Sequence, residues 1–361
     1  MRLNMHKLKN KFKRLFMSAA TIGTACLLAG CGAGAAAGTD NSSVTESQSG
    51  VNGSEQENAS SDSQKLQIVA TIFPEYDWVK EILGDQAENV DLTLLLGNGT
   101  DMHSFQPTME DILKVSTCDL FIYVGGESDS WVVDALKGAG NPDRKAINLM
   151  DVLGDQVKEE EIVEGMQDED GHTHEEEHTY DDDLEYDEHV WLSLKNASLF
   201  CDTIASSLAD VDPEHSRLYQ QNAEAYEEKL AALDQEYQTS VEKSQSKTLL
   251  FADRFPFRYL IDDYNLTYYA AFAGCSAETD ASFETITFLA GKLDELNLPA
   301  VLTIENSDQK VAKAVIENTN TKDQKILTLN SMQSVTTKDV EEGTTYLSIM
   351  ENNLQILKEA L

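Results

Sequence analysis

The chain has 361 residues, of which 64 are acidic and 27 are basic, and its formal net charge at pH 7 is −37. A surface with this charge repels nucleic acid, which excludes a nucleic-acid partner, and it attracts cations. After residue 30 no segment is long and apolar enough to cross a bilayer, which excludes a protein embedded in the membrane.

The first thirty residues predict an export signal. Residues 1–14 contain Lys and Arg but no acid, and the apolar stretch 15–28 that follows is too short to stay in a bilayer. It ends on Leu28-Ala29-Gly30-Cys31, which resembles the lipobox of bacterial lipoproteins. We therefore expect removal of residues 1–30 and acylation of Cys31, which would anchor the protein outside the cytoplasm, because each buried methylene contributes about 0.8 kcal/mol. The alternative is an ordinary secretory signal.

Residues 31–64 predict a disordered tether, since they are Gly, Ala, Ser, Asn, Gln and acids with almost no large apolar side chain. The remaining chain of about 300 residues is long enough for two cores. It contains Cys118, Cys201 and Cys275, whose wide spacing fits no metal knuckle, so we expect buried, apolar cysteines.

Short β-branched runs alternate with helical segments along the rest of the chain. The runs are apolar almost throughout, as expected when helices cover both faces of a parallel sheet. The sequence therefore predicts an α/β fold with an N-terminal lobe over 65–212 and a C-terminal lobe over 247–361. The expected strands are 66–72, 90–96, 120–126, 145–150, 248–252, 266–272, 300–305 and 325–330.

Residues 213–246 predict a helix that links the lobes. The stretch from Pro213 to Lys243 has no internal Pro or Gly, and Asp212 before Pro213 can cap its first turn. About 30 residues would span roughly 45 Å, longer than either lobe needs. Apolar side chains recur with helical spacing on one face: Leu218, Tyr226, Leu230, Leu233 and Tyr237.

Ligands of open α/β sheets lie beyond the carboxyl ends of the strands. His103 follows the strand at 90–96, Asp253 follows 248–252, and Glu305 ends 300–305 with Asp308 three residues on. His189 ends the acidic segment 158–188, which predicts a flexible loop. Two imidazoles and one or two carboxylates suit zinc or manganese, whereas calcium or magnesium would require oxygen ligands alone.

Two elements of the sequence resemble those of the substrate-binding lipoproteins of zinc and manganese ABC importers. GTDMH at 99–103, with Pro107-Thr108, matches the family's G-x-D-P-H-x-x-x-P-T-P element, with Met102 and Met109 in place of prolines. DEHVWLS at 187–193 matches D-P-H-x-W-L-S-P. The resemblance implies two lobes with four-stranded sheets joined by one long helix, and a metal ion held between them. It also implies an importer permease and ATPase as partners, and no enzymatic activity.

The resemblance fails at the third ligand. Zinc binders of the family place a histidine after the first strand of the second lobe and manganese binders a glutamate, but the local match puts Ala252 there. Asp253 could replace it or could instead form a salt bridge with Arg254. The family's fourth ligand is an acid, which implies Asp308, with Glu305 as the substitute.

The acidic loop also has a counterpart in zinc binders, which implies that His172, His174 and His178 form an accessory zinc-binding loop. The alternative is a solvated loop whose histidines bind nothing. Manganese binders generally lack the loop, so the predicted cargo is zinc, with manganese as the alternative. We expect a monomer. A surface metal scavenger or adhesin is a further alternative, and a secreted zinc hydrolase is disfavoured because G-x-S-x-G and an obvious second acid placed as a general base are absent.

Overall fold

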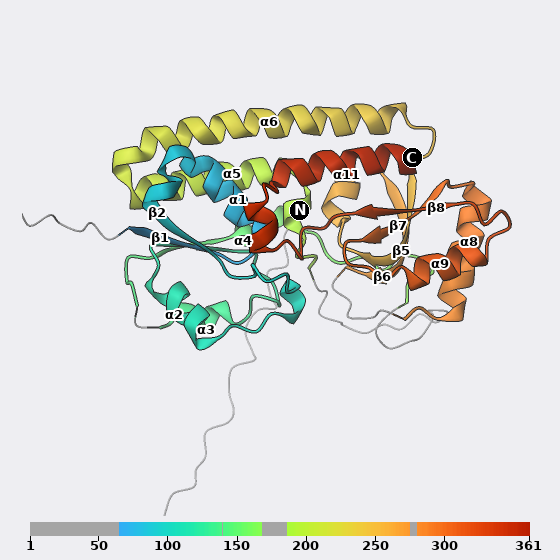
Figure 1. The fold of residues 1–361 in the computed structure, drawn as a ribbon, viewed down its shortest axis with the longest axis horizontal. Coiled ribbons are helices and arrows are strands. Elements are labelled where there is room, and N and C mark those ends of the chain that lie inside the picture. The colour runs from blue at the N-terminus through green and yellow to red at the C-terminus, as the bar shows by residue number, and fades with distance from the viewer. Residues whose placement is uncertain (1–64, 139, 168–185, 275–279) are drawn as a thin grey trace, which may run out of the picture. The chain divides into compact units, whose positions relative to one another are not determined.

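Figure 1 shows the computed structural model, which describes residues 65–138, 140–167, 186–274 and 280–361. The signal and tether with Cys31, the loop histidines His172, His174 and His178, and Cys275 lie outside the described residues. Across the described ranges, no helix is long and apolar enough to cross a membrane.

The N-terminal lobe contains a parallel sheet in the order β2-β1-β3-β4. The four expected strands are confirmed, although each ends two or three residues earlier than expected. The last residues of each expected strand instead lie in the turn, loop or helix that follows the strand at the carboxyl edge of the sheet. The strands are β1 (Leu66–Ala70), β2 (Val90–Leu94), β3 (Leu120–Tyr123) and β4 (Lys145–Asn148).

Helices cover both faces of this sheet, which explains why its central strands β1 and β3 are largely apolar (Figure 1). One face is covered by α1 (Phe73–Leu83), α4 (Leu149–Leu153) and α5 (Leu194–Val211), and the other by α2 (Met109–Thr117) and α3 (Val132–Leu136). Ile68 and Ile122 belong to the hydrophobic cluster on the first face, and Val69 and Phe121 belong to the cluster on the second.

The C-terminal lobe repeats this plan with a parallel sheet in the order β6-β5-β7-β8. Strand β5 runs to Phe255, three residues beyond the expected end, and its pairing with β6 shifts register between Phe251 and Arg254. The strands are β5 (Thr248–Phe255), β6 (Thr267–Ala273), β7 (Ala300–Ile304) and β8 (Lys325–Leu329). The helices are α7 (Arg258–Asp263), α8 (Phe283–Leu296), α9 (Lys310–Glu317), α10 (Thr337–Glu341) and α11 (Tyr346–Ala360).

The long helix α6 (Ser216–Lys243) runs alongside α5 and α11 in Figure 1. It begins later than expected, because Pro213–His215 form a separate 3-10 turn. Asp212 does not cap that turn; its carboxylate accepts hydrogen bonds from Tyr219 and His215. Tyr219 takes the buried position expected for Leu218, which is half-buried. The other four expected positions are buried.

One hydrophobic cluster extends through the N-terminal lobe, α6 and the inner face of the C-terminal lobe. Hydrogen bonds cross the same region: Tyr346 in α11 donates to the carbonyl of Trp191, and Tyr237 in α6 donates to that of Met350. Cys118 and Cys201 are buried free thiols, as expected. The two lobes therefore share a core.

Candidate metal centre

His103 lies on the turn that follows β2 at the carboxyl edge of the N-terminal sheet. Gly99 takes a positive φ of 79° in that turn, and Asp101 caps the short 3-10 helix Met102–Ser104. The Asp101 carboxylate accepts from the His103 backbone N–H at 3.1 Å. This cap fixes the backbone that carries the imidazole.

His189 precedes the 3-10 turn Val190–Leu192, just before α5. Asp187 Oδ1 accepts from its backbone N–H at 2.8 Å and lies 3.0 Å from its Nδ1. The imidazole is fully buried. A Cβ added to Gly274, at the end of β6, would lie 3.2 Å from His189 Cε1 and 2.8 Å from the Phe255 carbonyl oxygen. Only glycine lets the C-terminal lobe approach the ring so closely.

The two imidazoles meet through their Nε2 atoms, which are 3.1 Å apart. Two nitrogens bound to one tetrahedral zinc ion, each at about 2.0–2.1 Å, are separated by about 3.3 Å. The structure thus brings two ring nitrogens to nearly the separation that a single ion requires.

The Nδ1 atoms of both rings have partners that can accept a proton. Asp187 accepts from His189, while His103 Nδ1 lies 2.9 Å from Ser128 Oγ and 3.5 Å from Glu188 Oε2. Glu188 Oε2 is buried and makes no hydrogen bond within the described residues. A proton on each Nδ1 leaves each Nε2 lone pair free for a metal ion, as in most histidine ligands.

The two rings differ in their affinity for a proton. Burial, together with the charge of the neighbouring His189, lowers the pKa of His103 to about 3. Burial also lowers the pKa of His189, but the charge and hydrogen bond of Asp187, together with the charges of Glu188 and Asp101, outweigh burial and raise the pKa above its usual value. The pair therefore takes up one proton readily, on His189, and resists a second.

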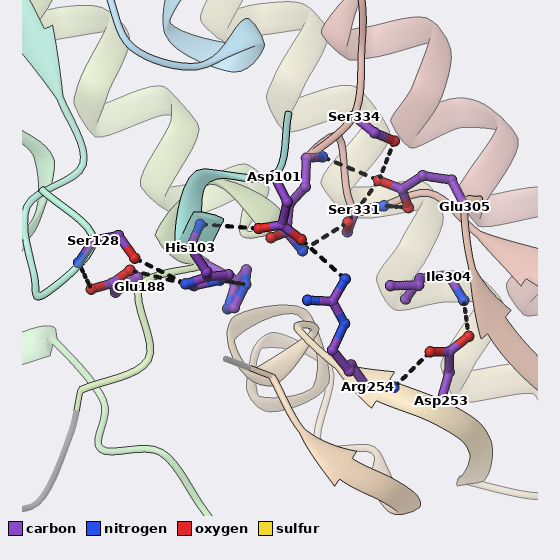
Figure 2. A network of polar contacts seen from close by, with 12 residues as sticks. Asp101, His103, Ser128, Glu188, Asp253, Arg254, Ile304, Glu305, Ser331 and Ser334 are labelled. Atoms are coloured by element: carbon purple, nitrogen blue, oxygen red, sulfur yellow. Dashed lines mark hydrogen bonds and ion pairs between the residues drawn. The ribbon is translucent and has the colours of Figure 1, made fainter. Parts of the chain in front are cut away.

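Asp253 does not join this pair through any contact within the described residues. Its carboxylate accepts from the backbone N–H of Arg254 at 2.9 Å and from that of Ile304 at 3.4 Å. The salt bridge considered between Asp253 and Arg254 is not formed; the guanidinium instead contacts Asp101 at 3.0 Å, across the two lobes (Figure 2). Ala252 is buried in a separate hydrophobic cluster, called here the outer cluster, between the C-terminal sheet and helices α8 and α9.

The other two expected carboxylates also have partners of their own. Asp308 is 59% exposed and pairs with Lys310. Glu305 accepts from the backbone and hydroxyl of Ser331 at 2.7 and 2.8 Å and from the Gln333 backbone at 3.1 Å. Within the described ranges, no three His, Cys, Asp or Glu side chains form a group that could hold a metal ion. Of the expected ligands, the structure brings together His103 and His189.

Sequence reasoning missed the residues that position the two histidines. Asp101 and Asp187 each stand two residues before a histidine and accept from its backbone N–H. This repeated D-x-H spacing was visible in the sequence. Ser128 and the ion pair of Arg254 gave no such signal, because their partners are distant in the chain.

A family profile described as the periplasmic component A of the zinc-uptake complex matches residues 68–360. The chain belongs to this family. It is 32% identical over 299 residues to the zinc-binding lipoprotein AdcA of Streptococcus pneumoniae serotype 4, covering 82% of this chain and 56% of that protein. The chain thus spans little more than half of the length of AdcA.

Three further relatives match this chain over at least 92% of their own length. The high-affinity zinc uptake system protein ZnuA of Bacillus subtilis strain 168 is 29% identical over 310 residues, covering 86% of this chain and 92% of that one. The Zn(II)-bound ZnuA-like domain of S. pneumoniae AdcA has a TM-score of 0.63 at 26% identity, with 82% and 98% coverage. The metal-dependent lipoprotein YcdH of B. subtilis has a TM-score of 0.66 at 26% identity, with 82% and 99% coverage. These likenesses confirm the expected family and two-lobed fold.

Proposed function

We propose that this protein captures zinc outside the cytoplasm and delivers it to an ABC importer made of a permease and an ATPase. The observation that carries the proposal is the pair of Nε2 atoms at 3.1 Å, with His103 and His189 each held at Nδ1 by a neighbour. The relatives named as zinc-binding or zinc-uptake proteins support zinc as the cargo.

Glu305, Asp253 and Asp308 remain the predicted carboxylate ligands. Glu305 has the best support, because it lines a cavity shared with Asp101 and Arg254. To reach an ion it would have to release Ser331 or Gln333. We also retain Cys31 as the lipid anchor, the loop of His172, His174 and His178 as an accessory zinc site, a monomeric state, and the absence of enzymatic activity.

Calorimetric titration of zinc and of manganese into residues 32–361 tests the site, since this chain keeps every described contact. Replacing both His103 and His189 by Ala should weaken zinc binding by at least about a hundredfold, because both proposed nitrogen ligands are lost. His215→Ala is the matched control, since His215 contacts Asp212 on a separate turn. Unchanged zinc affinity in the double variant would refute the site. Tighter binding of manganese than of zinc by the unchanged protein would identify manganese as the cargo.

Deleting residues 160–185 separates the accessory loop from the imidazole pair. One tight site should remain and weaker sites should disappear; loss of all zinc binding would move the site to the loop. Delivery is tested by zinc uptake in cells that lack the gene. The intact gene should restore uptake, and the double histidine variant should not.

A further inference from the structure

The imidazole pair has an unusual neighbour for a cation site, the guanidinium of Arg254. It is close enough to lower the pKa of His103. Its Nη2 contacts Asp101, and within the described residues its Nη1 and Nε make no hydrogen bond. A cation repels a divalent ion beside it, and an anion placed between the two offsets that repulsion.

Arg254 also borders a cavity of about 160 Å³, large enough for roughly five water molecules. Figure 2 shows Arg254 between His103 on one side and Glu305 on the other. Gln333, on the cavity wall, is 8% exposed, and its Oε1 makes no hydrogen bond within the described part of the chain. The cavity thus combines free guanidinium donors with a buried, unpartnered acceptor.

These groups are complementary to a small organic anion. A guanidinium binds a carboxylate through two parallel N–H donors. An amide oxygen accepts from a hydroxyl or an amino group. Glu305, the carboxylate on the same wall, already accepts three hydrogen bonds from Ser331 and Gln333. Within the described residues, the free groups on the cavity wall therefore include two guanidinium nitrogens of Arg254 and the amide oxygen of Gln333.

We propose that the site takes its ion as a chelate, in which a small hydroxy- or amino-carboxylate bridges the metal bound by His103 and His189 and the guanidinium of Arg254. This inference rests on the proposed function. The chelator's carboxylate neutralises the repulsion between the ion and Arg254, and its hydroxyl or amino group donates to Gln333. The chelator also supplies coordination positions that the protein's own ligands leave open.

The test measures how much chelator stays with the zinc. Residues 32–361 are dialysed to equilibrium against radioactive zinc with labelled citrate, and separately with labelled L-histidine, which distinguishes a hydroxy- from an amino-carboxylate. With at least one of them we expect about one chelator per bound zinc. Arg254→Gln should lower retained chelator at least tenfold, and Arg254→Lys should give an intermediate value, since Lys keeps the charge but lacks the paired donors.

Arg258→Gln is the matched control, because it removes a guanidinium from the same lobe that pairs with Glu161 and Asp262 away from this cavity. The inference would be overturned, and the proposed function left standing, if zinc bound without either chelator. The same would follow if Arg254→Gln retained as much chelator as the unchanged protein. Failure to bind zinc in every mixture would overturn the proposed function.

Discussion

At the scale of single residues, the main feature is that two adjacent imidazoles differ in protonation. The pKa of His103 is lowered to about 3, so this ring is neutral near pH 7. Asp187 helps to keep the pKa of His189 raised despite the burial of that ring. Metal binds neutral imidazole, so a proton on either ring competes with the ion. Between about pH 5 and pH 8, His189 is therefore the ring of this pair that can carry the competing proton.

This asymmetry predicts the pH dependence of zinc binding. Above the pKa of His189 the affinity should be constant, since no proton has to be displaced. Below that pKa it should fall tenfold per pH unit rather than a hundredfold, because one proton and not two is released. Competition with a zinc-binding dye between pH 7.5 and 5.5 measures the slope.

Asp187→Asn provides the control for that slope. Without the carboxylate, burial lowers the pKa of His189, so the fall in affinity should begin at a lower pH. A flat response in the unchanged protein from pH 7.5 to 5.5, or a hundredfold loss per unit, would contradict the assignment of the proton to His189.

At the scale of elements, strands and helices were largely predictable because their signals are local. Runs such as LQIVA indicate strands by their own composition, and the helical face of α6 follows from a spacing within one segment. The predicted start of α6 was three residues too early, since Asp212 accepts hydrogen bonds from the side chains of His215 and Tyr219 instead of capping the first turn.

The end of β5 shows why the third ligand could not be read from the sequence. Ala252 and Arg254 would share a face of a regular strand, but the register shift between Phe251 and Arg254 changes which side chain faces the site. Ala252 packs in the outer cluster, and Arg254 reaches Asp101, 153 residues away in the chain. A bulge of this kind depends on the neighbouring strand, so no local pattern indicates it.

The turn that carries His189 is attached to α11 by one side chain. Tyr346, fully buried at the start of α11, donates to the carbonyl of Trp191 at 2.8 Å. Tyr346→Phe should lower the free energy of unfolding by about 1 kcal/mol, since it removes one net hydrogen bond and keeps the ring. Urea unfolding measures the loss.

Tyr76→Phe is the matched control for that change, because Tyr76 is only half-buried and its hydroxyl makes no hydrogen bond within the described residues. It should change the stability little. Equal losses in the two variants would show that the contact with Trp191 contributes nothing specific.

At the scale of the whole molecule, the shared cluster argues against wide opening of the lobes. It runs from Trp78 in the N-terminal lobe through Tyr237 in α6 to Leu354 in α11, and separating the lobes would expose it. At about 25 cal/mol per Å² of apolar surface, each large side chain exposed would cost about 1.5–3 kcal/mol.

We therefore expect zinc to leave the radius of gyration unchanged within the error of small-angle X-ray scattering. Rearrangement should be confined to side chains and loops at the site, such as the pair of Arg254 with Asp101. A large decrease in the radius of gyration on adding zinc would instead indicate hinge closure, which this core does not favour.

The placement of the hydrophobic clusters also determines which parts of this chain could be exchanged with those of a relative in a chimera. The outer faces have separate clusters, one between β1, β3, α2 and α3 and the other between the C-terminal sheet, α8 and α9. The inner cluster belongs to both lobes at once. A chimera that exchanged a whole lobe with a relative would have to match every side chain across that inner boundary. Exchange of an outer helical layer would disturb one cluster only, so the natural modules of this fold are its outer layers rather than its lobes.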